Sequence, residues 1–508
     1  MKRRTKRGLL SIAAAGSMIG LIGCESIGGV DVNGAIAALV DVQSSEGTLS
    51  LSWDVAGENT GDAKADRLAA LFGSGAIVVN EVLQEDRDTA SLEGTIELSK
   101  GDIPFALYVD GDTMLLDVEG ARKPFKLDTP ALGGADAGAL LGGDALSEAL
   151  SGDAGRQATR DILKYALGHV PNPADAKLGT TTATIDGAAK SLTTVSANVG
   201  VDELLELVST AAAEIAADEE GLRELLGAVY DALKPTLEEL AEESDEPLLK
   251  LAVKNKALAV QYFQGQIVSM LDGLTAEPEA VGWFGTALTP ESGATFELLL
   301  DGAKPVGLDV SVYVEPATDA ADGFGAMRFD IESRWWNVGG DVKAKPIAGE
   351  GAPFPTDVKP RERLSNVESD SLLYDILKND LRINRHSFEL SMGGDAGVPD
   401  GVSPYIKGAG TTMVPVRYVS EQLDATVSWD AATSTITIKD AVEGTTIVMK
   451  IGSKSATVNG VAQSLPEAPE IIASTNSTFV PIGFITLALG GEKAWDPESG
   501  IVTIAKEF

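Results

Sequence analysis

The stretch Thr412-Met-Val-Pro-Val-Arg-Tyr418 returns 66 residues later as Thr478-Phe-Val-Pro-Ile-Gly-Phe484, and this recurrence decides the fold of the carboxy-terminal quarter. The same offset joins five pairs of residues: Val414 and Val480, Pro415 and Pro481, Leu423 and Leu489, Trp429 and Trp495, and Asp430 and Asp496. A shared offset at so many unlike positions indicates an internal duplication. We place the two repeats at about 382–438 and 447–504.

Each repeat predicts a strand that ends at Val-Pro, a short amphipathic helix, a second strand that carries Trp-Asp, a turn and a third strand. Proline after the first strand stops the hydrogen-bond ladder and presets φ for entry into the helix. A unit of about 60 residues buries little of its chain when alone, so we expect the two repeats to pack on each other.

The two tryptophans can be interpreted in two ways. We predict that Trp429 and Trp495 are buried core anchors in equivalent positions, each followed by an Asp that accepts a hydrogen bond in the next turn. The alternative is a surface platform that binds a sugar ring.

These residues also carry a family resemblance. The run Val414-Pro-Val-Arg-Tyr-Val-Ser-Glu-Gln-Leu423, followed by Val427-Ser-Trp-Asp430, resembles the small amino-terminal stalk domain of copper amine oxidases, which occurs without any oxidase in many surface proteins of Gram-positive bacteria. The resemblance covers roughly residues 382–506. The second copy has Gly483 in place of Arg417, so it predicts that any role of this arginine is confined to one repeat.

The resemblance implies a stalk and no oxidase. Copper amine oxidases bind copper through three histidines and make a quinone cofactor from a tyrosine in a separate catalytic domain. This chain has two histidines, His169 and His386, so we expect no copper centre, no cofactor and no catalytic residues. The same scarcity argues against a Ser-His-Asp triad, a multi-histidine zinc site and a Cys-His nucleophile. Each histidine is expected to be a surface or structural residue.

The amino terminus predicts export. Met1–Arg7 carries five positive charges, and the small and apolar run Gly8–Gly23 has the length of a signal-peptide core and is too short to span a membrane. The run ends in Leu21-Ile22-Gly23-Cys24, which resembles the bacterial lipobox, and Cys24 is the sole cysteine. We therefore expect residues 1–23 to be a lipoprotein signal peptide. Lipidation of Cys24 would then anchor the chain in the cell membrane on its extracytoplasmic face. The alternative is an ordinary signal peptide followed by a buried cysteine.

The charge of the chain restricts its partners. Without the five cations of residues 1–23, the mature chain has 40 − 5 = 35 basic and 76 acidic residues, a net charge of 35 − 76 = −41. A polyanion of this kind repels phosphate backbones, so nucleic acid is not expected as a partner. The acidity favours solubility.

The middle of the chain predicts one α+β domain at 36–343, after a Gly-rich tether at 24–35. Period-two alternation predicts antiparallel strands over 36–128, as in Thr48–Trp53 and Gly94–Ser99, and again over 257–343. Three-four spacing of apolar residues predicts helices at 156–167, 202–217 and 219–243, the last kinked or ended by Pro235.

This order of elements predicts that the helices pack on a single antiparallel sheet. It loosely resembles the half-barrel lipoproteins of the lipoprotein-carrier type, in which a curved sheet and helices enclose an apolar cavity. Asp110-Gly-Asp112 lies between two apolar runs, which favours a hairpin turn over a calcium loop. A proline-rich linker at 344–365 is expected to be a semi-extended spacer before the stalk domain at 366–508.

Three functions compete. The first is a non-enzymatic envelope lipoprotein whose stalk contacts cell-wall polymer or another envelope protein. The second is a carrier or binding protein for an apolar ligand in the half-barrel, which an apolar cavity would favour. The third is a carboxylate-dependent hydrolase, for which the sequence offers abundant acids but no motif.

Overall fold

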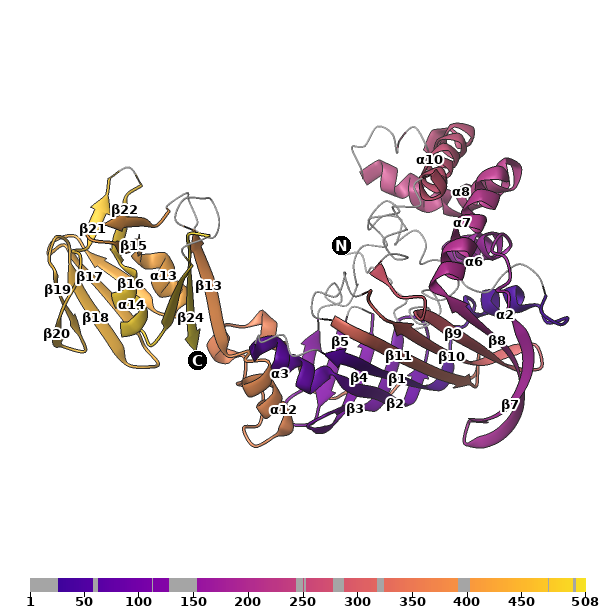
Figure 1. Cartoon of the computed structure of the whole chain (residues 1–508), viewed down its shortest axis with the longest axis horizontal. Coiled ribbons are helices and arrows are strands. Elements are labelled where there is room, and N and C mark those ends of the chain that lie inside the picture. The colour runs from indigo at the N-terminus through magenta and orange to yellow at the C-terminus, as the bar shows by residue number, and fades with distance from the viewer. Residues whose placement is uncertain are drawn as a thin grey trace. The chain divides into compact units, whose positions relative to one another are not determined.

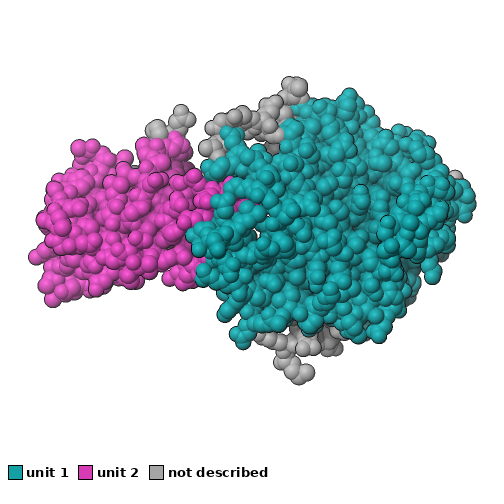
Figure 2. Space-filling view, turned by 90° about the horizontal axis from the view of Figure 1, so that it is seen from below, with its two compact units in different colours: residues 1–354, 366–375 teal, residues 355–365, 376–508 magenta. Residues whose placement is uncertain are grey.

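The computed structural model describes residues 26–57, 63–111, 113–127, 153–243, 250, 253–276, 287–317, 324–391, 403–473, 475–496 and 499–508. The chain divides into two compact units (Figure 2). The first, here called the half-barrel unit, comprises Met1–Phe354 and Asn366–Asp375. The second, here called the C-terminal unit, comprises Pro355–Ser365 and Ile376–Phe508.

The described residues of the half-barrel unit contain one twelve-stranded sheet. Its strands are β1 (Ser45–Gly57), β2 (Ser74–Gln84), β3 (Thr89–Leu98), β4 (Gly101–Asp110), β5 (Thr113–Val118), β6 (Phe125–Leu127), β7 (Lys177–Ile185), β8 (Ala188–Gly200), β9 (Gly293–Asp301), β10 (Lys304–Val314), β11 (Phe324–Trp336) and β12 (Ala352–Pro353). Their order is β12-β6-β5-β4-β3-β2-β1-β11-β10-β9-β8-β7, antiparallel except where β12 meets β6. The sheet curls into a half-barrel (Figure 1) and confirms the predicted α+β class.

Alternation and turn chemistry explain most of these strands. Strand β1 joins the two halves of the sheet, because Leu51 lies opposite Ile331 of β11. Asp110-Gly111 forms a tight hairpin as predicted, with Asp110 paired to Thr113, and Asp301-Gly302 forms another, with Asp301 paired to Lys304. Asp112 lies outside the described residues.

Helices α2 (Val32–Leu39), α6 (Asp153–Leu167) and α7 (Val201–Ala217) pack on the sheet, whereas α8 (Glu219–Glu243) and α10 (Lys256–Ala276) pack on other helices (Figure 1). Leu167 of α6 contacts the cluster around Val195 and Leu298, and Leu207 of α7 contacts that around Phe296. The three predicted helices are thus confirmed. Pro235 lies inside α8, which continues to Glu243, so the prediction that proline could end this helix is wrong.

Some elements were not expected. Residues 256–276 form α10 and residues 63–72 form α3 (Ala63–Phe72), although strands were predicted there. Ala, Leu, Gln and Met favour helix at these positions, and 21 residues exceed the usual length of a strand. Strands β7 and β8 were not predicted, although the Thr-rich run Thr180–Thr184 suits a strand.

The predicted tether is wrong for the described residues 26–35. Ile27 pairs with Val30, and Asp31 caps α2 by accepting a hydrogen bond from the Gly34 amide at 2.8 Å. Ile27 and Val32 are buried against the sheet and α6. Apolar side chains between the glycines therefore hold this segment in the fold.

The predicted linker is also wrong as a spacer. Ala352 extends the sheet beside Phe125, and the rings of Phe354 and Phe125 lie 5.7 Å apart, edge to face. Further along, Val367 pairs with Ala121, so residues 366–375, with α12 (Leu372–Asp375), belong to the half-barrel unit. The 3-10 turns Pro355–Asp357 and Pro360–Glu362 belong to the C-terminal unit, which also contains the π-helical turn Ile376–Asp380.

The C-terminal unit consists of three small sheets and two short helices in its described residues. Its elements are β13 (Arg385–Ser391), β14 (Tyr405–Lys407), β15 (Thr411–Pro415), α13 (Val416–Gln422), β16 (Thr426–Asp430), β17 (Thr435–Asp440), β18 (Thr445–Lys450), β19 (Ser455–Val458), β20 (Val461–Ser464), β21 (Glu470–Ile472), β22 (Ser477–Pro481), α14 (Ile482–Ala488), β23 (Glu492–Asp496) and β24 (Ile501–Glu507). Strands β15, β16 and β17 and helix α13 each begin 66 residues before β22, β23, β24 and α14, which confirms the duplication.

The repeats exchange strands. Strand β13, from the first repeat, completes the sheet of the second as β13-β24-β23, and β18, from the second, lies beside β17 of the first. The predicted boundaries 382–438 and 447–504 therefore do not match the sheets, because each range contains a strand that pairs with the other repeat. Strands β15 and β22 pair with each other, so the repeats do pack together as expected.

Candidate functional site

The residue predicted to carry lipid, Cys24, lies outside the described residues. None of the described helices is long and apolar enough to cross a membrane.

Both histidines have structural partners. The Nδ1 atom of His169 lies 2.8 Å from the carbonyl oxygen of Tyr165, and its Nε2 atom lies 3.3 Å from Asp218 Oδ2. The Nε2 atom of His386 lies 2.9 Å from Gln422 Oε1. These contacts agree with a structural interpretation of both residues. The described part of the chain contains no group of three or more His, Cys, Asp or Glu residues that could hold a metal ion.

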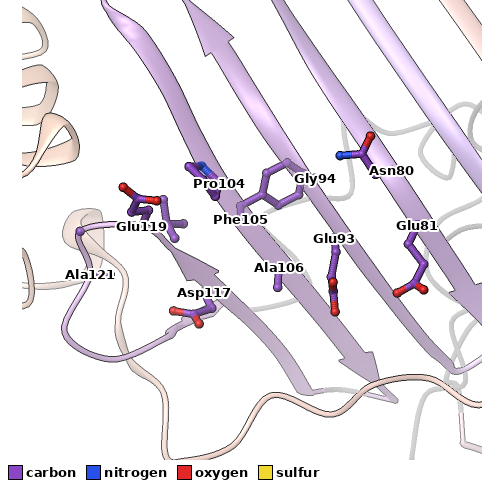
Figure 3. Close-up of a pocket in the computed structure, with 12 residues that line it drawn as sticks. Asn80, Glu81, Glu93, Gly94, Pro104, Phe105, Ala106, Asp117, Glu119 and Ala121 are labelled. Carbon is purple, nitrogen blue, oxygen red and sulfur yellow. The ribbon is translucent and has the colours of Figure 1, made fainter.

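A pocket of 660 Å³ lies on strands β2–β5 of the half-barrel sheet (Figure 3). Four carboxylates line it: Glu81, Glu93, Asp117 and Glu119. Lys345 forms ion pairs with Glu81 and Glu93, and hydrogen bonds to these two carboxylates raise the pKa of Lys345. The pocket is therefore acidic, which suits an apolar ligand poorly.

The C-terminal unit has a second pocket, of 290 Å³, in which both repeats take part. The first repeat contributes Arg417 and Trp429, and the second contributes Ile471, Asn476 and Ser477. An indole and an isoleucine thus share a hollow with a guanidinium group, an amide and a hydroxyl.

The prediction that both tryptophans are buried is wrong. Trp429 is 42% exposed and Trp495 is 48% exposed. Trp429 pairs with buried Ile436, so it lies on the core face of its sheet, but β16 and β23 are the last strands of their sheets. An edge strand has a neighbour on one side only, and the outer side of each indole is therefore left open.

The Asp residues behind the tryptophans act as predicted. Asp430 accepts hydrogen bonds from the Thr433 hydroxyl at 2.7 Å and from the Ala432 amide at 2.9 Å, and these bonds hold its pKa below the usual range. Asp496 accepts one from the Ser499 hydroxyl at 2.5 Å. These bonds fix the turns that follow β16 and β23.

The second repeat carries its cation at a different position from the first. Gly483 stands where the first repeat has Arg417, and Lys493 stands where it has Val427. A Cβ atom on Gly483 would lie 3.2 Å from Cε of Lys493, so the lysine side chain covers the glycine. The second repeat thus lacks the arginine itself but has a lysine side chain over the glycine, and the expectation that any role of Arg417 is confined to one repeat stays a prediction. The sequence does contain this signal, since both substitutions appear at the 66-residue offset.

Taken together, the fold and the pockets define an α+β protein that joins a half-barrel unit to a duplicated, strand-exchanged unit with exposed aromatic residues. Within the second unit, residues 396–505 match the family model of the copper amine oxidase N-terminal domain. The match confirms the resemblance seen in the repeats. A comparison of the whole chain with curated proteins finds no match.

Proposed function

We propose that this protein is a non-enzymatic lipoprotein of the cell envelope, anchored through Cys24 on the extracytoplasmic side of the membrane. Its C-terminal unit contacts cell-wall polymer or another envelope protein.

The exposure of Trp429 and Trp495 carries this proposal. Two large aromatic side chains are open to water at equivalent positions of the two repeats, and aromatic residues of this kind are enriched where proteins bind partners. The family model that matches this unit describes a non-catalytic domain, which supports a binding role.

The carrier hypothesis has less support. The described pocket of the half-barrel unit is lined by Glu81, Glu93, Asp117 and Glu119. Burying an apolar ligand there would desolvate carboxylates without giving them new partners. The hydrolase hypothesis gains nothing from this pocket either, because Lys345 already pairs with two of the four acids.

The experiment is recovery of partners from intact envelope. The purified full chain, carrying an affinity tag, is incubated with isolated envelope, and bound lipids, sugars and proteins are identified by mass spectrometry. We expect wall polymer or an envelope protein. Recovery of nothing, or of a stoichiometric apolar lipid alone, would contradict the proposal.

A further inference from the structure

Each repeat presents one tryptophan together with one cation. In the first repeat, Arg417 and Trp429 line one pocket, and Arg417 Nη1 lies 3.4 Å both from the carbonyl oxygen of Val427 and from Oε1 of Glu421, its exposed ion-pair partner. In the second repeat, Lys493 is exposed two residues before Trp495 and forms no ion pair with the described residues. The cation lies on helix α13 in the first repeat and on strand β23, two residues before Trp495, in the second.

An exposed isoleucine accompanies each pair. Ile471, 42% exposed, lies in the pocket of Trp429 and pairs with Thr478. Ile406, 59% exposed, pairs with Thr412, the residue equivalent to Thr478. The pairing of β15 with β22 relates the repeats by an approximate twofold axis, which places Ile406 on the Trp495 side. This symmetry predicts a second surface around Trp495 that resembles the pocket of Trp429, each built from both repeats.

We propose that these surfaces are two subsites for one anionic polysaccharide, a polymer of sugar rings that carry carboxylate or phosphate groups. This inference rests on the proposed function and narrows its partner to a polymer class. The indole and isoleucine cover the apolar face of a sugar ring, while Asn476 and Ser477 offer hydrogen bonds to its hydroxyls.

The two cations indicate that the ligand is anionic. The chain has a net charge of −36, so an exposed Arg or Lys retained beside each tryptophan stands out against an acidic background. A guanidinium group binds carboxylate or phosphate with two parallel hydrogen bonds, and an ammonium group binds either as a point charge. Two subsites on one unit also allow a repeating polymer to bind both at once.

The test measures binding of the full chain to three probes by isothermal titration: polygalacturonate, a hexose-phosphate polymer and uncharged dextran. We expect at least one anionic probe to bind at least tenfold more tightly than dextran. Trp429→Ala and Trp495→Ala should each weaken that binding about fivefold, and the double variant more than either. Arg417→Gln and Lys493→Gln should reduce the preference for the anionic probe over dextran.

Leu487→Ala and Val461→Ala are matched controls, because both side chains are exposed apolar residues of the same unit. They should bind as wild type does. Which of the two anionic probes binds identifies carboxylate or phosphate as the anion. Equal binding of all three probes, or unchanged binding by the tryptophan variants, would overturn the inference. If the inference is overturned in this way but the wild-type chain still recovers an envelope protein, the proposed function remains supported.

Discussion

Val414 and Val480 occupy equivalent positions in the two repeats and lie opposite each other where β15 pairs with β22. Both side chains are fully buried. A pair formed by equivalent residues requires an approximate twofold axis between them, as in a symmetric dimer. The duplicated unit thus has the internal geometry of a dimer whose two halves are covalently linked.

This pair should be coupled energetically. Val414→Ala and Val480→Ala should each cost about 2 kcal/mol, because each removes buried apolar surface from the centre of the unit. Because the residues are in contact, the double variant should differ from the sum of the single variants by about 0.5 kcal/mol or more. The free energy of unfolding of each variant is measured in urea, and hydrogen exchange of peptides from 403–508 reports on this unit. Strictly additive losses of stability would argue against a shared core at the axis.

The tryptophans should matter little for stability. Since about half of each indole is open to water, Trp429→Ala and Trp495→Ala should each cost about 1 kcal/mol, well below the 3–5 kcal/mol typical of a buried aromatic residue. Phe479→Ala is the matched comparison, because Phe479 is 2% exposed and should show the larger loss. Equal losses for Phe479 and the tryptophans in the same unfolding assay would show that the indoles are core residues after all.

The C-terminal unit contains a buried ion network around Asp440. Its carboxylate is 1% exposed and lies 2.8 Å from Lys506 Nζ and 3.1 Å from Arg361 Nη2, while Arg361 Nε also lies 2.7 Å from Asp424. Arg361 belongs to the segment that was predicted to be a spacer. Removing one partner from such a network leaves a buried charge without compensation, so Asp440→Asn should cost about 3–5 kcal/mol near neutral pH.

The ionisation of the Asp440 carboxylate predicts that the stability of the C-terminal unit depends on pH. Burial raises the pKa of Asp440, but hydrogen bonds from Lys506 and from the amides of Glu443 and Val442 outweigh it and hold the pKa below its usual value. The ionised group therefore stabilises the fold above about pH 4, and this stability is lost as the pH falls through the folded pKa. Asp440→Asn should flatten this acid limb in pH-dependent unfolding. Glu421→Gln, at an exposed helical pair, should leave it unchanged.

Asp218 joins two helices of the half-barrel unit. Its Oδ1 atom accepts a hydrogen bond from the Gly221 amide at 2.9 Å, which caps α8, and its Oδ2 atom lies 3.1 Å from the Tyr165 hydroxyl. The Gly221 bond is the main reason why the pKa of Asp218 is lowered. Asp218→Ala should lower the melting temperature by about 2–4 °C. Asp218→Asn keeps a capping oxygen and should melt close to wild type; a large drop for Asn would assign the effect to charge alone.

Cys24→Ala tests the anchor. Without the thiol that accepts the lipid, the chain should accumulate as an unprocessed or mislocalised precursor. Cell fractionation and mass spectrometry of the amino terminus provide the measurement. Cleavage of the variant after Gly23, together with normal membrane retention, would show that Cys24 is not the lipidation site.

Local rules explain what could be predicted. The 66-residue offset predicted the duplication, and Asp110-Gly111 predicted a hairpin, because turn chemistry depends on adjacent residues. The helices at 202–217 and 219–243 followed from apolar spacing along one face. Alternation likewise predicts which side chains share a face of a strand.

Alternation does not determine which strands pair with each other. The tertiary structure determines this pairing. The exchange of β13 and β18 between the repeats, and the edge positions of β16 and β23, result from pairing between segments far apart in the chain. Those edge positions leave Trp429 and Trp495 open. The sequence by itself determined that each repeat carries a tryptophan and a cation. Only the folded unit decided that they reach the surface, because exposure depends on which neighbours cover a side chain.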